Sequence, residues 1–108
     1  MNDATTPSGQ PGALTREQID AGLAGLNEWK LSDDGTRIQR AFRMKNFLHA
    51  LRFFDRIAEV AEADNHHPDL HLTGYRNVVV ELWTHTLGGV SESDIQMAAK
   101  LDAIPVGD

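Results

Sequence analysis

The sequence predicts an α+β fold with two layers, in which a four-stranded antiparallel sheet carries helices on one face. Two observations support this prediction. The segments read, in chain order, as helix, strand, strand, helix, strand, strand, helix. Each pair of strand-like segments is joined by a short turn that contains glycine, which is typical of a hairpin. Two hairpins separated by a helix favour an antiparallel sheet covered on one side and open to solvent, substrate or a partner on the other.

The length and composition limit the function classes. A chain of 108 residues is long enough for one hydrophobic core and too short for two. It has no cysteine, which excludes disulfides, a thiolate nucleophile and cysteine-ligated metal sites. A net charge of −6 argues against a nucleic-acid partner, because phosphate binding needs a concentrated excess of Lys and Arg. No apolar run approaches the roughly 20 residues of a membrane span, so we expect no membrane partner.

Residues 1–13, "MNDATTPSGQPGA", are expected to form a disordered lead-in to a single domain of residues 14–108. Their Pro, Gly, Ser and Thr content leaves too little apolar surface to order the segment. They lack the basic and apolar regions of a signal peptide, so the expected location is cytoplasmic.

The first helix is predicted to begin after Thr15. Thr15 can cap the helix, Gln18 can complete a capping box, and Leu14 can pack on Ile19. The apolar stripe then continues through Leu23 and Leu26.

The first hairpin is predicted from "EWKLS" and "TRIQRAFRM". These two segments flank Asp33, Asp34 and Gly35, and an Asp-Gly pair is a strong signal for a hairpin turn.

A long central helix is predicted from about Asn46. One stripe at helical spacing is expected to face the core: Phe47, Leu51, Phe54, Ala58 and Ala61. A second stripe, Phe53, Ile57 and Val60, lies beside it. This surplus stripe indicates either a deeply seated helix or a surface that meets a second subunit.

The second hairpin is predicted to follow Pro68, which disfavours helical backbone at His67. "DLHLT" alternates, Gly74 supplies a turn, and "YRNVVVELWTHT" is a long β-rich run. In an extended strand the side chains of Val78, Val80, Leu82 and Thr84 share one face, and those of Val79, Glu81, Trp83 and His85 share the other.

The last helix is predicted to begin after Ser91. Ser91 is the expected cap, Asp94 stands at the third helical position, and Val90 can pack on Ile95. This capping position alone accounts for Asp94.

Histidines gather after the central helix. His66, His67 and His71 fall within six positions, and His85 follows, so four of the five histidines lie in one fifth of the chain. Imidazole titrates near neutral pH and also binds metals, so both kinds of chemistry are open. A metal site would use His67, Asp69 and His71, but Pro68 interrupts that strand and no ligand signature such as HExxH is present.

Proton transfer is the second interpretation of the cluster. A helix that ends at Asn65 would bring His66 and His67 to the sheet edge, where they can face His85. Such imidazoles supply both an acid and a base. A purely structural alternative is that His66 and His67 cap the last carbonyls of the helix. His49 and His71 are expected at the surface.

The spacing of Glu62, His66-His67-Pro68, Tyr75, His85 and Asp94 resembles the signature of the pterin-4a-carbinolamine dehydratases. The resemblance covers about residues 14 to 104. It includes Trp29, the helix "NFLHALRFFDRIAEVAE" and the closing segment "GGVSESDIQMAAKLD". Trp83 departs from it, because many members carry a small polar residue there.

The resemblance implies a hydro-lyase that converts 4a-hydroxytetrahydropterin into quinonoid dihydropterin in tetrahydrobiopterin recycling, without metal or organic cofactor. It implies that His66 and His85 are the acid and the base and that His67 orients the pterin. The substrate-binding residues that it implies are Glu62, Asn65, Trp29, Pro68 and Thr84. It also implies a homodimer or homotetramer. The alternative function is a non-enzymatic dimerisation or interaction module on the same fold.

Overall fold

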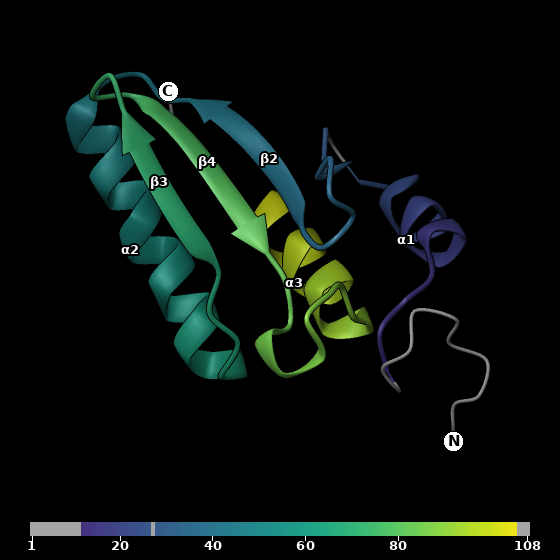
Figure 1. The fold of residues 1–108 in the computed structure, drawn as a ribbon. Helices are drawn as coiled ribbons and strands as arrows, with labels where there is room; N and C mark the ends of the chain where they lie inside the picture. The colour runs from purple at the N-terminus through teal and green to yellow at the C-terminus, as the bar shows by residue number, and fades with distance from the viewer. Residues whose placement is uncertain (1–11, 27, 106–108) are drawn as a thin grey trace.

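The computed structural model describes residues 12–26 and 28–105, and Figure 1 shows their arrangement. The elements are α1 (Arg16–Leu23), β1 (Lys30–Leu31), β2 (Ile38–Arg43), α2 (Phe47–Asp64), β3 (Asp69–Thr73), β4 (Asn77–Leu82), the 3-10 turn η2 (His85–Leu87) and α3 (Glu92–Asp102). The four strands form one antiparallel sheet in the order β1-β2-β4-β3. Helices α2 and α3 lie on the same side of this sheet (Figure 1). The predicted α+β fold is confirmed.

The predicted lead-in lies outside the described residues except at its end. Gly12 and Ala13 are described, and Ala13 is buried and forms an isolated bridge with Ser91. The next amide, that of Leu14, donates to the carbonyl of Val90 at 2.8 Å. These contacts fasten the start of the fold to the turn before α3.

Helix α1 begins with the predicted capping box. The Gln18 amide donates to Thr15 Oγ1 at 3.1 Å, and the Thr15 amide donates to Gln18 Oε1 at 2.8 Å. The helix ends at Leu23, earlier than the stripe through Leu26 predicted, because Gly25 is a poor helix former. Leu26 still packs against the core.

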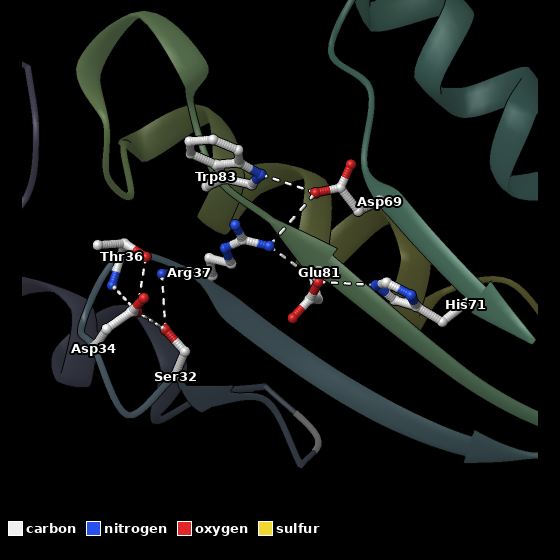
Figure 2. Close-up of polar contacts among 8 residues, drawn as sticks. All are labelled: Ser32, Asp34, Thr36, Arg37, Asp69, His71, Glu81 and Trp83. Atoms are coloured by element: carbon white, nitrogen blue, oxygen red, sulfur yellow. Dashed lines mark hydrogen bonds and ion pairs between the residues drawn. The ribbon is translucent and has the colours of Figure 1, made fainter.

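Asp34 organises the turn between β1 and β2 (Figure 2). Its Oδ1 accepts from the hydroxyls of Ser32 and Thr36 at 2.8 and 2.7 Å and from the Thr36 amide at 3.0 Å. Hydrogen bonds from Thr36 and Ser32 lower the pKa of Asp34 from 3.8 to about 2. Gly35 adopts a φ of 77°, which suits a residue without a side chain. The hairpin is confirmed, with β1 only two residues long.

Strand β4 alternates as predicted, but it is shorter than predicted. Val78, Val80 and Leu82 are buried toward the helices. The strand ends at Leu82, so the expectation that His85 lies on its polar face is wrong. The Thr84 amide bonds to the Gly89 carbonyl at 2.8 Å, which closes a loop and turns the chain into η2.

The stripe of α2 that was predicted to face the core is mostly not the buried one. The buried positions are Ala50, Phe53, Ile57 and Ala61, so two members of the surplus stripe are buried, whereas the predicted core stripe contributes Ala61. Phe47 is 51% exposed and Leu51 is 39% exposed, although both were expected in the core. Both stripes have helical spacing, and the contact of Phe53 with Phe42 on β2, at 4.9 Å between ring centroids, determines which one faces the sheet.

A largely buried ion pair ties α3 to the sheet. Arg40 on β2 contacts Asp102 at 2.7 Å, and the Trp29 indole Nε1 donates to the same carboxylate oxygen at 2.8 Å. The Arg40 and Asp102 side chains are 16% and 9% exposed. Removing one partner of such a pair leaves an uncompensated charge, so both residues should matter for stability.

Within the described ranges, none of the helices combines the length and the apolar character that crossing a membrane requires.

Candidate active site

The end of α2 delivers two histidines to the sheet edge. Asn65 adopts a left-handed conformation with φ 51° and ψ 43°, which ends the helix. The His66 amide still bonds to the Ala61 carbonyl at 3.1 Å, and β3 begins at Asp69. The short segment from Asn65 to Pro68 is therefore anchored at both ends, and its histidine rings have defined directions.

His66 is paired with a buried carboxylate from α3. Its Nε2 lies 2.5 Å from Oδ1 of Asp94. The Asp94 side chain has no exposed surface, and the His66 side chain is 19% exposed. An ionised carboxylate only accepts hydrogen bonds, so Nε2 carries the proton in this contact and Nδ1 is the remaining ring nitrogen.

The second oxygen of Asp94 is also occupied. Oδ2 accepts from the Ser91 amide at 2.9 Å and from the Thr84 hydroxyl at 2.8 Å. The Ser91 contact is the predicted helix cap. Asp94 therefore both caps α3 and orients His66, and hydrogen bonds satisfy both of its buried carboxylate oxygens.

His67 has a carboxylate partner of a different kind. Its Nε2 lies 2.6 Å from Oε2 of Glu62, one turn back on α2. The two side chains are 57% and 75% exposed, so water screens this pair. The contact with Glu62 orients a ring that remains accessible.

His85 reaches the same region from the other side. It opens η2 and is exposed. Its imidazole stacks on the indole of Trp83, with the ring centroids 4.0 Å apart and the planes inclined by 30°.

These side chains surround a hollow of about 250 Å³. It is lined by Asn65, His66, His67, Trp83, Thr84, His85 and Thr86. The volume is slightly below the roughly 300–1,000 Å³ of usual small-molecule pockets. A neighbouring polar hollow of about 310 Å³ includes only one of these histidines, His66. The first hollow is therefore the candidate active site.

The structure brings together five of the residues predicted from the sequence: His66, His67, His85, Asn65 and Thr84. Glu62 takes part through His67. Pro68 is half-buried and Trp29 is in the core, bonded to Asp102, and neither lines this hollow.

The residues of the hypothetical metal site engage three different partners. His67 contacts Glu62, His71 contacts Glu81 at 2.9 Å, and Asp69 accepts from the Trp83 indole at 2.9 Å. Among residues 12–26 and 28–105, no group of three or more His, Cys, Asp and Glu side chains is placed to hold a metal ion.

Sequence reasoning missed two members of the site. Asp94 belongs to the spacing that resembles the family signature, but its role was attributed to helix capping, and Trp83 was noted only as a departure from the family. The available signal for Asp94 was its place in that spacing, which a cap alone does not explain. For Trp83 the signal was its position two residues before His85.

The chain is similar to proteins of known family. The family model described as "Pterin 4 alpha carbinolamine dehydratase" matches residues 12–104. The mitochondrial pterin-4-alpha-carbinolamine dehydratase 2 of Arabidopsis thaliana is 41% identical over 98 residues, which are 89% of this chain and 52% of that protein. The chain thus spans about half the length of the plant relative. The protein named "Putative pterin-4-alpha-carbinolamine dehydratase" of Halorhodospira halophila is 43% identical over 84% of this chain and 83% of its own length.

A solved structure is also similar. The transcriptional coactivator/pterin dehydratase of Brucella melitensis matches with a TM-score of 0.79 and 37% identity, over 84% of this chain and 96% of the other. The matches agree with the resemblance seen in the histidine spacing. The chain belongs to the pterin-4a-carbinolamine dehydratase family, whose named members are hydro-lyases.

Proposed function

We propose that this chain dehydrates 4a-hydroxytetrahydropterin to quinonoid dihydropterin. The observation that carries the proposal is the convergence of His66, His67 and His85 on one hollow, with a carboxylate behind two of the three rings. Membership of the dehydratase family supports the substrate class.

The reaction needs two proton transfers. The C4a–O bond breaks, and the departing hydroxyl takes up one proton and leaves as water. The N5–H bond gives up its proton to a base, and its electron pair forms the C4a=N5 double bond. One group must therefore donate a proton and another must accept one, each contributing roughly 10²–10⁴-fold to the rate.

His66 and His85 are the pair that we assign to these transfers. His66 has its Nε2 on Asp94, so its Nδ1 is available for a proton of the substrate. His85 lies across the hollow on η2, in a different environment. The two imidazoles line the hollow from two different segments of the chain, so one can donate a proton to the substrate while the other accepts one.

The remaining side chains of the hollow hold the substrate. His67 is exposed and fixed by Glu62, which suits it to orient the polar edge of a pterin. Asn65 and Thr84 offer further hydrogen-bonding groups. Trp29 packs on Asp102 in the core, so we assign it and Pro68 to support of the fold.

We propose a cytoplasmic enzyme of tetrahydrobiopterin recycling that needs neither metal nor organic cofactor. The chemistry requires only proton transfers, for which the histidines suffice.

The test is a dehydration assay on the purified protein, with and without a chelator. Activity should survive the chelator. His66→Ala and His85→Ala should each lower the rate at least about tenfold. His71→Ala is the matched control, because His71 also pairs with a carboxylate but lies outside the hollow. Equal rates in wild type and both site variants would contradict the proposal.

A second role as a self-association module is favoured by the exposed face of α2. Phe47, Leu48 and Leu51 are 51%, 52% and 39% exposed, and exposed apolar groups in a cluster mark interaction surfaces. We propose that this face joins copies of the chain into a homodimer or homotetramer. Leu51→Glu should lower the mass measured by light scattering, and Glu59→Lys, on an exposed position of the same helix, serves as the control. A wild-type protein that is monomeric at high concentration would exclude this role.

A further inference from the structure

His85 has little to hold its ring in place. It is exposed, and its imidazole makes no hydrogen bond or ion pair with any residue in the described ranges. A group that transfers a proton must be held near its productive position, because an error of about 1 Å can cost roughly 10²-fold in rate. Something other than a hydrogen bond must therefore restrict this side chain.

The indole of Trp83 supplies that restriction. The two ring centroids are 4.0 Å apart, which is stacking contact. Trp83 directly follows the last residue of β4 and is half-buried. His85 therefore rests against a ring that comes from the sheet.

Trp83 is itself fixed from two other elements. Figure 2 shows its Nε1 directed toward Asp69 at the start of β3, and this hydrogen bond measures 2.9 Å. Arg37 immediately precedes β2, and its guanidinium carbon lies 4.7 Å from the centroid of the indole. An indole with a hydrogen bond and a cation on it has few alternative rotamers.

Arg37 is in turn held by acidic groups on the open face of the sheet. It pairs with Glu81 at 3.2 Å and approaches Asp69 at 3.8 Å (Figure 2). Glu81 also contacts His71. The Arg37 amide bonds to Ser32 Oγ at 3.1 Å, so the turn ordered by Asp34 fixes the start of this chain of contacts.

The arrangement joins the two sides of the hollow. His66 and His67 stand on the segment that leads into Asp69, and His85 stands on the segment that follows Trp83. The hydrogen bond from Trp83 to Asp69 links these segments on the open side of the sheet. On the side of α3, Asp94 links them, because it contacts His66 and accepts from the Thr84 hydroxyl.

We propose that Trp83 is a positioning residue for His85: its indole, anchored by Asp69 and Arg37, holds the imidazole at the rim of the hollow. This inference rests on the proposed function in so far as His85 takes part in the reaction. The stacking itself is a property of the folded chain and can be tested without any substrate.

The kinetic test compares Trp83→Leu, which removes the ring, with Trp83→Phe, which keeps an aromatic face. Trp83→Leu should lower kcat about tenfold with KM changed less than about threefold, and Trp83→Phe should retain most of kcat. In the dependence of kcat/KM on pH, the limb that reports the protonation of His85 should move to a different pH in Trp83→Leu. A higher KM with unchanged kcat would overturn the proposal, because it would make Trp83 a substrate-binding residue only.

Asp69 provides a rescue experiment. Asp69→Ala removes the acceptor of the indole and should lower kcat toward the Trp83→Leu value, while Asp69→Asn keeps an acceptor oxygen and should restore most of it. Equal kcat values in wild type and Asp69→Ala would contradict the proposed anchor.

A spectroscopic test reads the contact directly. A protonated imidazole quenches a stacked indole more strongly than a neutral one, so Trp83 emission in a Trp29→Phe background should rise between about pH 5 and 8. His85→Gln should abolish this transition and His71→Gln should preserve it. Other titrating or charged groups near the indole are Arg37 and Asp69, with His66 and His67 lining the same hollow. A transition that persists in His85→Gln would overturn the stacking.

Trp29 is buried, so the Trp29→Phe replacement can impair folding. The emission of wild type and of His85→Gln is therefore also compared in proteins that keep both tryptophans.

The outcomes distinguish the proposed dehydratase function from the proposed positioning role of Trp83. A wild-type protein without dehydration activity but with the emission transition contradicts the proposed function and leaves the contact intact. An active wild type whose kcat is unaffected by Trp83→Leu contradicts the positioning role alone.

Discussion

Nε2 of His66 lies 2.5 Å from Oδ1 of Asp94, a carboxylate that has no exposed surface. The two residues are 28 positions apart, at the end of one helix and in the first turn of another. Three further contacts, from the Ser91 amide and from the hydroxyls of Thr84 and Ser91, hold the other carboxylate oxygen. The His66 ring is consequently oriented by a group that cannot itself move toward solvent.

Replacing Asp94 by Asn should impair catalysis more than folding. Asn keeps an oxygen for the Ser91 amide but offers no charge to His66, so the preferred tautomer and the stabilisation of the imidazolium are lost. We expect kcat to fall at least about tenfold. Steady-state kinetics with a thermal melt check this, and Glu92→Gln, an exposed acid in the same helical turn, is the control. Wild-type kcat in a folded Asp94→Asn protein would exclude the orienting role.

The pH profile should separate the roles of the two histidines. An acid and a base that both act in the reaction give a bell-shaped dependence of kcat/KM on pH. His66→Gln and His85→Gln should each retain residual activity, and each profile should lack one limb of the bell. The missing limb should differ between the two variants. Loss of the acidic limb identifies the replaced residue as the base, and loss of the basic limb identifies it as the acid. The same limb missing from both profiles would contradict the assignment of one histidine to each transfer.

Replacement of Asp102 should lower the stability of the fold, although Asp102 does not line the hollow of the candidate active site. Asp102→Ala leaves Arg40 charged and largely buried and deprives the Trp29 indole of its acceptor. Breaking a buried pair costs about 3–5 kcal/mol, and we expect a loss of free energy of unfolding in this range. Denaturant titration measures it. Arg40→Met combined with Asp102→Leu should be less destabilising than Asp102→Ala, because no uncompensated charge remains. Equal stability of Asp102→Ala and wild type would contradict the role of the pair.

Asp34 should show a pH-dependent contribution to stability. Its pKa is lowered from 3.8 to about 2 in the folded state, so the hydrogen bonds of the turn favour folding above pH 4. This contribution is lost as the pH falls through about 2, because the carboxyl is then protonated in both states. Asp34→Ala should be less stable than wild type at pH 6, with a smaller difference near pH 2. NMR titration of the carboxyl checks the pKa, and a value near 3.8 would show that these hydrogen bonds are not formed in solution.

The elements were predictable because local rules determine them. Thr15 and Gln18 form their capping box, Gly35 takes the positive φ of the turn, and Val78, Val80 and Leu82 alternate as buried positions of β4. The end of β4 was not predictable in this way. β-branched and aromatic residues continue past Leu82, but the bond from Thr84 to Gly89 turns the backbone aside and places His85 on η2.

Helix α2 shows that the spacing of apolar residues predicts a helix but does not predict which side of it faces the sheet. Its two apolar stripes have the same spacing, so either can face a sheet. Phe53 and Ile57 are buried, and Phe53 packs on Phe42 of β2. Which residues of the sheet lie beneath the helix depends on hydrogen bonds between strands, and the helix pattern contains no information about them.

Local patterning in the chain was sufficient for the order of elements, their caps and turns, and the gathering of His66 and His67 after a helix. Which residues contact these histidines was decided by the packing of the helices and the sheet. Asp94 meets His66 because α3 starts beside the end of α2, and Trp83 meets His85 because a loop folds back after β4. Contacts between neighbours in the chain follow from residue type and spacing. Contacts between distant residues depend on how the helices and the sheet bury their apolar faces together, and this packing builds the candidate site.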